Sequence, residues 1–333
     1  MSHWIERHWQ QLTPLSVALT PLALLYRLIA SLRRLACRLA SAHRLPVPVI
    51  VIGNISVGGT GKTPLTIHLA QRLCQLGHRP GIISRGYGGS AQSPTRVDSN
   101  SPASLVGDEP LLIARHTGCP VYVYRDRAAA GAALLAAHPD RTLLLCDDGM
   151  QHYSLARDIE IAVVDAARGF GNRLPLPAGP LREPTTRLQE VTAIVVNGVG
   201  QPTLPRTVPT FHMQLSGHQC YQLLAPQHIC PVNQLPGKVM AVAGIGHPQR
   251  FFSQLQSLGL IADSTAFPDH HAFSAAELAF PGYDTILLTE KDAIKCASFK
   301  DDRIWVFPVS AALEPDLARY IVERLKPDGP ETA

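Results

Sequence analysis

One stretch, Val49–Thr63 (VIVIGNISVGGTGKT), constrains the fold of this chain more than any other. Its apolar start is rich in β-branched residues, which predicts a buried strand. A glycine-rich turn follows, and the run of Leu65, Leu69 and Leu73 after it predicts an amphipathic helix. A strand, a glycine loop and a helix in this order form the setting of a phosphate-binding P-loop.

The residues of this turn have the chemistry that a nucleotide needs. Glycine permits positive φ, so several backbone N–H groups can face one concavity, and the helix N-terminus adds the positive end of its dipole. Lys62 is expected to reach the β- and γ-phosphates, and the Thr63 hydroxyl is expected to hold Mg²⁺. The predicted nucleotide-binding residues are Ser56, Val57, Gly58, Gly59, Thr60, Gly61, Lys62 and Thr63.

One position departs from the full P-loop pattern, which has glycine where this chain has Ser56. Gly58 and Gly59 can supply the missing backbone freedom. The alternative is a glycine-rich turn between a strand and a helix that binds nothing. The position of GKT between the two expected elements favours the nucleotide site.

A second candidate element is the apolar run Thr142–Cys146, which is followed by Asp147 and Asp148. Two acids after a buried strand are typical of a Walker B element, whose carboxylates meet the metal ion held by the P-loop threonine. Alone, this pattern is often a simple turn, but the upstream GKT strengthens it. We therefore expect a Mg²⁺ ion to lie among Thr63, Asp147 and Asp148.

The charge of the chain is concentrated at one end. The formal net charge is +4, and residues 1–45 contain six Arg against Glu6 alone, which leaves 24 basic against 25 acidic residues elsewhere. This distribution favours an anionic surface near the N-terminus and argues against a general nucleic-acid binder. The seven Cys have neither C-x-x-C nor zinc-binding spacing, which is typical of reduced thiols in a cytosolic protein.

The N-terminal segment predicts an amphipathic helix that begins at Thr20-Pro21. Its apolar residues at steps of three and four share one face: Leu25, Ile29, Leu32, Ala36 and Leu39. Three basic residues fall on the opposite face: Arg27, Arg34 and Arg38. The aromatic residues of the segment suit a lipid headgroup region: Trp4, Trp9 and Tyr26.

Several roles for this helix compete. A membrane-spanning helix is disfavoured because Arg27 interrupts Leu12–Ala30 and two prolines break it. A cleaved signal peptide is disfavoured because a P-loop needs cytosolic nucleotide and no small-residue cleavage site follows a short apolar core. A helix packed on the body of the protein is a further alternative. We favour an interfacial helix that lies on an anionic membrane.

The remaining pattern predicts an α/β fold. Apolar runs alternate with helical stretches as far as Ile159–Asp165 and Ala193–Asn197, which predicts a P-loop NTPase-like parallel sheet flanked by helices. The pattern breaks into Pro, Gly and Gln around Gly198–Arg206, and a second, smaller α/β domain is expected after it. The expected division is a membrane-associating helix over 1–45, a P-loop core over 46–200 and the smaller domain over 201–333.

Two polar clusters follow expected strands of the second domain, Pro268–His271 (PDHH) and Thr289–Asp292 (TEKD). Adjacent His residues after a strand point in opposite directions, so a hydrogen-bonding or catalytic pair is favoured over a metal site. A solvated loop is the alternative for either cluster. TEKD differs from the guanine-reading N-K-x-D pattern because Lys291 and Asp292 are adjacent, which leaves ATP as the expected nucleotide.

Seven strings occur in this chain in the order that is typical of one protein family: SVGGTGKTP (56–64), SRGYGG (84–89), GDEP (107–110), DDGMQH (147–152), LPAGPLREP (176–184), FPDHHAF (267–273) and TEKDAIK (289–295). On these residues, the chain resembles the tetraacyldisaccharide 4′-kinases, the lipid A 4′-kinases of Gram-negative bacteria, over essentially its whole length. Ser56 belongs to the pattern of that family. Several of the strings are more specific than a P-loop alone.

The resemblance implies transfer of the γ-phosphoryl group of ATP to the 4′-hydroxyl of a tetraacylated glucosamine disaccharide 1-phosphate, which forms lipid IVA. It implies a peripheral enzyme on the cytoplasmic face of the inner membrane, with Mg²⁺ as cofactor. The hydrophobic substrate would stay in the bilayer, so a helix at headgroup level would let the enzyme reach the polar hydroxyl.

The resemblance also implies roles for individual residues. Asp108 is the implied base, with His270 as its partner and Lys62 as a further catalytic residue. Glu109 joins the acidic metal shell, Tyr87 joins the nucleotide contacts, and TEKD is placed near the adenine. The implied substrate contacts are Arg127, Gln151, His152, Arg182 and Asp269. Since Asp108 and His270 belong to different expected domains, closure of two lobes is expected to complete the site.

Two other functions are weighed against this one. The first is a membrane-associated P-loop switch ATPase without a sugar acceptor. Such proteins often carry a second Lys just before the paired glycines, where this chain has Val57. The second is a soluble kinase for a small alcohol, with the N-terminal helix packed as core. Turnover of acylated and deacylated acceptors would separate the second function from the lipid kinase.

Overall fold

The computed structural model describes residues 8–40 and 42–325, together with all their side chains except that of Arg38. Trp4 therefore lies outside the described residues. The helices are α2 (Pro14–Ala18), α3 (Thr20–Leu39), α4 (Lys62–Gln75), α5 (Ala103–Val106), α6 (Asp108–Thr117), α7 (Arg127–Ala137), α8 (Pro248–Ser257), α9 (Glu290–Lys295) and α10 (Leu317–Leu325), with short 3₁₀ turns η1 (Thr185–Gln189) and η2 (Val232–Gln234).

The strands, in chain order, are β1 (Val49–Gly53), β2 (Pro80–Ser84), β3 (Thr95–Val97), β4 (Val121–Val123), β5 (Leu143–Asp147), β6 (Ile159–Asp165), β7 (Ala193–Asn197), β8 (Thr210–Ser216), β9 (Gln219–Gln222), β10 (Ile229–Pro231), β11 (Val239–Ala243), β12 (Ala262–Ala266), β13 (Thr285–Thr289), β14 (Ile304–Phe307) and β15 (Ser310–Glu314).

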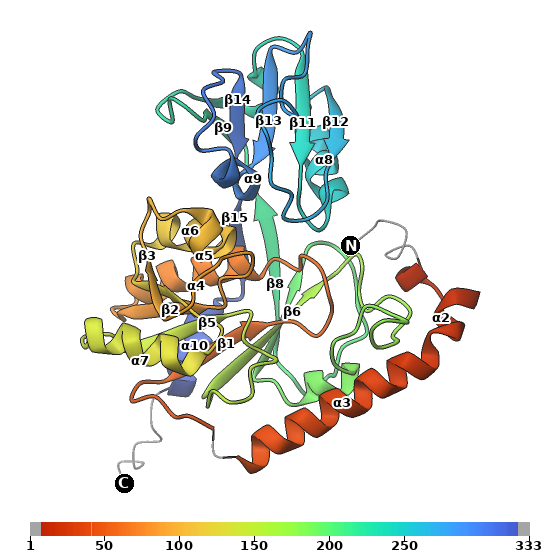
Figure 1. Ribbon diagram of the computed structural model, residues 1–333, viewed down its shortest axis with the longest axis vertical. Helices are drawn as coiled ribbons and strands as arrows, with labels where there is room; N and C mark the ends of the chain where they lie inside the picture. The colour runs from red at the N-terminus through yellow and green to blue at the C-terminus, as the bar shows by residue number, and fades with distance from the viewer. Residues whose placement is uncertain (1–7, 41, 326–333) are drawn as a thin grey trace.

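The larger sheet forms the first lobe (Figure 1). In the described part of the chain it has nine strands in the order β15-β8-β7-β6-β1-β5-β2-β4-β3. Its neighbours pair in parallel, except for the outer pairs β3/β4 and β15/β8. The predicted α/β fold with a P-loop-type parallel sheet is therefore confirmed.

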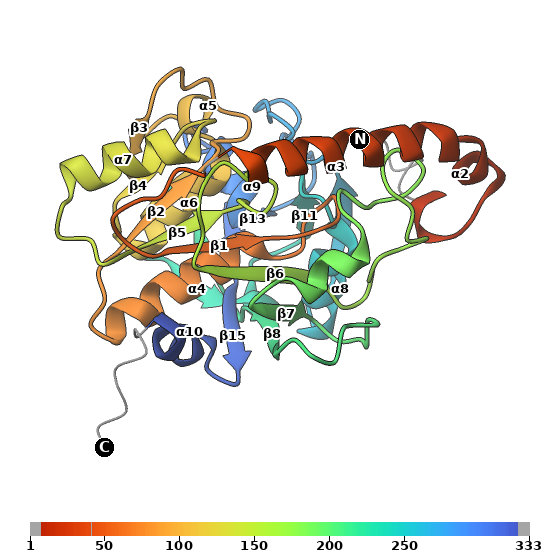
Figure 2. The same ribbon diagram turned by 90° about the horizontal axis from the view of Figure 1, so that it is seen from below.

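Helices cover both faces of this sheet because its central strands are apolar on both sides. Ile50 and Ile52 of β1 pack in the same core as residues of α4, α6 and α10. Val49 and Val51, which alternate with them, pack against residues of α7. Figure 2 shows α4 and α10 on one side of β1 and β5, and α7 and α3 on the other.

The second lobe has its own sheet and its own core. Its strands lie in the order β10-β9-β14-β13-β11-β12 within the described residues, and β12, β11, β13 and β14 are parallel. Phe251 and Leu255 of α8 pack against one face of this sheet, and Ala293 and Cys296, in and just after α9, against the other. The predicted smaller α/β unit is present above the first lobe in Figure 1.

The boundary between the lobes differs from the one expected near residue 200. The chain leaves the first lobe along β8 and returns along β15, and these two strands pair antiparallel at the edge of the larger sheet. Leu317 and Ile321 of α10 then pack in the core that contains Ile50 and Leu69. The second lobe is therefore the segment between β8 and β15, and the C-terminal helix belongs to the first lobe.

Helix α3 lies along the first lobe (Figure 2), and its large apolar side chains are exposed. Ala23 is buried and Tyr26, Ala30 and Arg34 are partly buried, so these residues form the inner face. The large apolar side chains on the rest of the helix are each at least 51 % exposed: Leu22, Leu24, Leu25, Leu28, Ile29, Leu32, Leu35 and Leu39. No helix in the described residues is long and apolar enough to cross a membrane.

One expectation for the aromatic residues is wrong. Trp9 does not lie at an exposed surface; it is 5 % exposed, and its indole N–H donates to the Pro177 carbonyl over 2.9 Å. Tyr26 is half-buried against the first lobe. These aromatic residues therefore attach the N-terminal segment to the protein, and the exposed apolar surface consists of aliphatic side chains.

The assignment of α10 to the first lobe can be tested by Ile321→Ala. Because Ile321 is fully buried in the core of that lobe, we expect a loss of about 2–5 kcal/mol in the free energy of unfolding. Chemical denaturation measures it, and Glu323→Ala, at an exposed position of the same helix, is the control. A change in Ile321→Ala no larger than in the control would contradict the assignment.

Candidate active site

A cleft of about 1610 Å³ lies between the two lobes. Its walls include the P-loop and the first turns of α4 from the first lobe, and the loops after β11 and β12 from the second lobe. Val309, Ser310 and Leu215, at the crossing of the lobes, also line it. This volume exceeds that of a typical single-ligand pocket of about 300–1,000 Å³, so the cleft has room for two substrates.

The P-loop has the backbone geometry expected from its glycines. Gly58 and Gly61 have φ values of 97° and 93°, which L-residues rarely adopt. A Cβ atom at Gly61 would also lie 2.3 Å from Nδ2 of Asn197. Gly61 immediately precedes α4, so Lys62 and Thr63 are at the helix N-terminus and both line the cleft. Conformation and close packing therefore both require glycine here.

Three residues that support the P-loop were missed in the sequence. Asn197, at the carboxyl end of β7, donates through Nδ2 to the Thr60 carbonyl over 2.9 Å. Arg250 of α8 donates to Oδ1 of the same Asn197 over 2.8 Å, and so connects the second lobe to the loop. Arg168 donates to the Val57 carbonyl over 2.9 Å. Asn197 has a sequence signal, because polar residues at carboxyl ends of parallel strands often face a ligand; Arg168 and Arg250 have none.

Two acids stand at the carboxyl end of β5: Asp147 is its last residue, and Asp148 follows it. Asp147 is fully buried, and its Oδ1 accepts from the Thr66 hydroxyl over 2.9 Å. Burial, followed by the charges of Glu109 and Asp148, raises the pKa of Asp147. Oδ1 of Asp148 lies 3.4 Å from Lys62 Nζ. Burial raises the pKa of Asp148, but Lys62 and Arg182 outweigh it and hold that pKa below its usual value.

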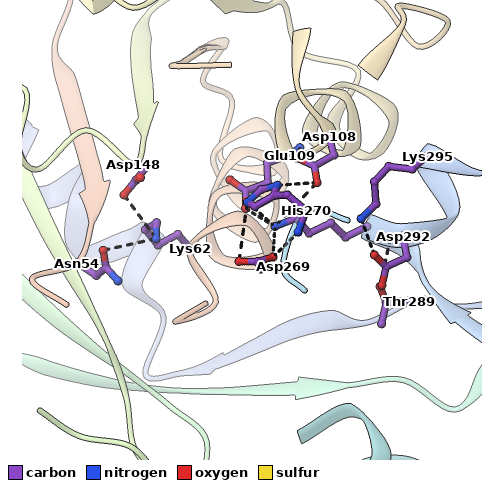
Figure 3. A network of polar contacts seen from close by, with 11 residues as sticks. Asn54, Lys62, Asp108, Glu109, Asp148, Asp269, His270, Thr289, Asp292 and Lys295 are labelled. Carbon is purple, nitrogen blue, oxygen red and sulfur yellow. Dashed lines mark hydrogen bonds and ion pairs between the residues drawn. The ribbon is translucent and has the colours of Figure 1, made fainter. Parts of the chain in front are cut away.

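Asp108 and His270 face each other across the lobes, as Figure 3 shows. Asp108 is in the first turn of α6, and its Oδ2 accepts a hydrogen bond of 3.1 Å from Nδ1 of His270. Burial raises the pKa of Asp108, but the hydrogen bond from His270 and the charge of Lys291 hold it below its usual value. The hydrogen bond to Asp108 raises the pKa of His270. Asp108 is therefore ionised at neutral pH.

Lys291 of the TEKD cluster lies at this pair of residues. Its Nζ is 2.9 Å from Glu109 Oε1, 3.5 Å from Asp269 Oδ1 and 4.0 Å from Asp108 Oδ2. Burial lowers the pKa of Lys291, but these carboxylates raise it above its usual value. Asp292, beside it, is fully buried, and its Oδ2 accepts from the Thr289 hydroxyl over 2.7 Å. Thr289 caps the start of α9, because its hydroxyl oxygen accepts from the Asp292 N–H over 3.2 Å. Lys291 thus joins the acidic cluster, a role that the sequence interpretation did not give it.

The two His residues of PDHH point to different partners, as expected. His271 Nε2 lies 3.0 Å from Glu277 Oε1, whereas His270 turns to Asp108. His270 has φ of 60° and Asp148 has φ of 47°, values that are uncommon for residues other than glycine. Such a backbone persists where surrounding contacts fix it, which is frequent at functional sites.

The other predicted site residues divide into two groups. Arg182, Asp269 and Tyr87 line the cleft, and the Tyr87 ring lies 5.0 Å from that of His270. The second group lies behind the acids and is not among the cleft-lining residues: Arg127, Gln151 and His152. Arg127 donates to the Asp148 carbonyl over 3.3 Å. Burial and the Arg127 charge lower the pKa of His152 to about 4, so its ring is neutral.

The carboxylates leave two buried oxygens without a hydrogen-bond partner, Oδ2 of Asp147 and Oδ1 of Asp148. Such atoms suit a hard cation or its bound water. No group of three or more His, Cys, Asp or Glu side chains in residues 8–40 and 42–325 forms a complete metal site. A cation that keeps its waters and binds nucleotide phosphates, as Mg²⁺ does, needs only one or two protein carboxylates. The residues present therefore fit Mg²⁺ bound together with a nucleotide.

Comparison with known proteins places this architecture in one family. Residues 15–326 match the family model for LpxK, tetraacyldisaccharide-1-P 4′-kinase. The chain is 49 % identical to the tetraacyldisaccharide 4′-kinase of Dechloromonas aromatica over 98 % of both proteins. It is 47 % identical to that of Methylobacillus flagellatus over 97 % of this chain and 96 % of the relative.

A solved structure agrees with the sequence comparisons. The crystal structure of LpxK from Aquifex aeolicus in complex with ATP is similar to this one with a TM-score of 0.79 and 29 % sequence identity. The similarity covers 93 % of this chain and 99 % of that one. The similarity therefore extends over both lobes. The chain belongs to the tetraacyldisaccharide-1-P 4′-kinase family.

Proposed function

We propose that this protein transfers the γ-phosphoryl group of ATP to the 4′-hydroxyl of a tetraacylated glucosamine disaccharide 1-phosphate at a membrane surface, with Asp108 as the base. As a member of its family, it is a tetraacyldisaccharide 4′-kinase, an ATP-dependent phosphotransferase of lipid A biosynthesis. The observation that carries the proposal is the Asp108–His270 pair, in which the buried Asp108 holds His270, a residue that lines the same cleft as Lys62 of the P-loop.

The chemistry of phosphoryl transfer requires alignment and charge neutralisation. Lys62 at the start of α4 and the backbone N–H groups of Gly58–Gly61 would hold the phosphates, as in other P-loops. The ATP-bound relative with the same architecture supports this assignment. Arg182, on the wall of the cleft, would neutralise further charge on the phosphates or on the acceptor.

Asp108 has the properties of an acceptor-side base. Its carboxylate is ionised, is only 6 % exposed and is oriented by His270, while Lys291 balances the surrounding negative charge. The carboxylate would accept the proton of the sugar hydroxyl as the new O–P bond forms, and the imidazole would keep it oriented. Tyr87 and Asp269 border the same part of the cleft and would contact the substrates.

Magnesium would be held near the P-loop by Thr63 and by the acids after β5. For this role Asp147 has Oδ2 without a hydrogen-bond partner, and Asp148 has Oδ1, which only faces the Lys62 ammonium at 3.4 Å. Glu109 is engaged by Lys291 at 2.9 Å and would join as an outer charge. When bound, the ion would neutralise charge on the phosphates. Asp147, whose pKa is raised without a cation, would be ionised in the magnesium-loaded site.

The exposed face of α3 supports the proposed membrane location. Its outward face consists of exposed Leu and Ile side chains, and Arg27 and Arg33 are exposed along its edges. An apolar stripe flanked by cations binds peripherally to an anionic surface, with the apolar side chains among the acyl chains. This arrangement would place the cleft at the headgroups of the cytoplasmic face of the inner membrane, where an acylated disaccharide presents its sugar.

The activity can be tested with ATP, Mg²⁺ and the tetraacylated disaccharide 1-phosphate. We expect a product heavier by one phosphate, and Lys62→Ala should lower its rate of formation about 10²–10³-fold because a phosphate contact is lost. Mass spectrometry detects the product, and Lys300→Ala, at an exposed Lys, is the control. ATP hydrolysis without the acceptor would instead favour a switch ATPase.

The pair of residues at the acceptor can be tested by mutation. Asp108→Ala and His270→Ala should each lower kcat by about 10²–10⁴-fold, since either change removes an oriented base. Because the two side chains act together, the double variant should be little worse than the slower single variant. Steady-state kinetics measures this, and fully additive losses would refute the pair as a unit.

The electrostatics of the pair can be measured directly by NMR titration of His270. The Asp108 carboxylate stabilises the imidazolium and raises the pKa of His270, so Asp108→Asn should lower that pKa. Lys291 acts in the opposite direction, so Lys291→Met should raise the same pKa. Shifts of the same sign in both variants would contradict the geometry described here.

A further inference from the structure

The inner face of α3 contacts the walls of the active site. The Tyr26 hydroxyl donates to the Arg182 carbonyl over 3.5 Å. About two turns further along, the Arg34 guanidinium forms an ion pair with Glu190 and lies over the Tyr153 ring, 5.4 Å from its centre. Arg34 is only 18 % exposed, although it belongs to a helix whose opposite face is open. The helix therefore contacts Arg182, which lines the cleft, as well as Glu190 and Tyr153.

From Tyr153, hydrogen bonds continue inward. The Tyr153 hydroxyl donates to one carboxylate oxygen of Glu183, and Gln151 Nε2 donates to the other over 2.7 Å. The same Nε2 donates to the Asn54 carbonyl over 2.9 Å, immediately before the P-loop. Glu183 is 7 % exposed, and Arg187 Nε lies 3.4 Å from it. Hydrogen bonds thus join the partly buried Tyr153 and Gln151 to the buried Glu183, and such bonds are stronger in a low-dielectric environment than in water.

The network ends at the P-loop lysine. Arg182 donates to Gln151 Oε1 over 3.3 Å and lies 3.6 Å from Asp148 Oδ2. Asp148 in turn lies 3.4 Å from Lys62 Nζ. Arg182, whose carbonyl accepts from Tyr26 of α3, is therefore connected through Asp148 to Lys62.

The backbone of the loop over residues 177–182 also connects the N-terminal segment to the P-loop. Arg182 N–H donates to the Ile55 carbonyl over 2.8 Å, and Val57 N–H donates to the Pro180 carbonyl over 2.9 Å. On its other side, the loop accepts the indole N–H of Trp9 at Pro177. It therefore lies between the N-terminal helices and the P-loop and contacts both.

We propose that Tyr26 and Arg34 of α3 are positioning residues for phosphoryl transfer, which act through Arg182, Glu183 and Gln151. The proposal rests on the kinase function given above and goes beyond it. The outer face of α3 binds the lipid surface, whereas its inner face sets the geometry around Asp148 and Lys62. The two faces of one helix thus have separable effects on the reaction.

The separation can be measured with the full chain, the tetraacylated acceptor and vesicles of phosphatidylglycerol and phosphatidylethanolamine. For the inner face, Tyr26→Phe and Arg34→Met should each lower kcat about tenfold, the factor that corresponds to one lost hydrogen bond of about 1.4 kcal/mol. Their co-sedimentation with vesicles should remain at the wild-type level. Arg34→Lys, which keeps the charge facing Glu190, should recover part of kcat.

Outer-face variants of the same helix provide the comparison. Leu25→Ser and Ile29→Ser should weaken co-sedimentation and raise KM for the lipid, because they remove apolar area from the exposed face. Ser31→Ala, at an exposed position of α3 without a role in either surface, should match the wild type. If the inner-face variants also changed only KM and vesicle binding, α3 would be an anchor alone and the proposal would be wrong.

A double-mutant cycle separates positioning from loss of structure. If Tyr26 acts through Arg182, Tyr26→Phe should lower kcat in the wild type and have almost no effect in an Arg182→Ala background. Additive losses, or a lower melting temperature that accounts for the lower kcat, would overturn the proposal. The wild-type enzyme tests the proposed function independently, because absence of phosphorylated product with the wild type would refute the kinase assignment. If the wild type forms the product and the inner-face variants have the same kcat, only this inference is refuted.

Discussion

A partly buried lysine between three carboxylates is the interaction on which the arrangement of the site depends. Lys291 comes from the second lobe, and it lies within 4.0 Å of Asp108, Glu109 and Asp269. An ammonium group removed from water is costly unless paired, and so are the carboxylates, so each lobe supplies the charge that the other requires. The orientation of His270 toward Asp108 is possible only with the lobes in this relation. The cleft is therefore defined by electrostatics as much as by shape.

Much of this molecule is predictable from its sequence because local signals and the global fold agree. The strand before the glycine loop, the P-loop itself and the acids after β5 follow from apolar periodicity and glycine conformation, which act within a few residues. The ends of β6 and β7 also coincide with the apolar runs that predict them. The pairing of Asp108 with His270 came only from family resemblance, since 162 residues separate them in the chain.

Sequence patterns could not predict the tertiary contacts between segments that are far apart in the chain. The contacts of Arg250 with Asn197, and of Lys291 with Glu109, join segments whose proximity no local pattern encodes. The helical period places apolar and basic residues of α3 on opposite faces, but it does not say which face the protein covers. Ala23 and Ala30 face inward together with Tyr26 and Arg34. Arg34 finds polar partners there in Glu190 and Tyr153, and Tyr26 finds one in the Arg182 carbonyl. The expected domain boundary failed for a related reason: α10 has an ordinary amphipathic pattern, and only packing assigns it to the first lobe.

The crossing of the chain between the lobes has a consequence for how such an architecture can arise. Ser216 at the end of β8 is the register partner of Ser310 at the start of β15. Two strands in this relation are the arms of a hairpin, and a short turn would suffice to join them. The entire second lobe thus occupies the position of a hairpin tip, where insertions are tolerated because the flanking pairing is kept. An ancestral nucleotide-binding sheet could have gained His270 and Lys291 in a single insertion, without rearranging any strand already present.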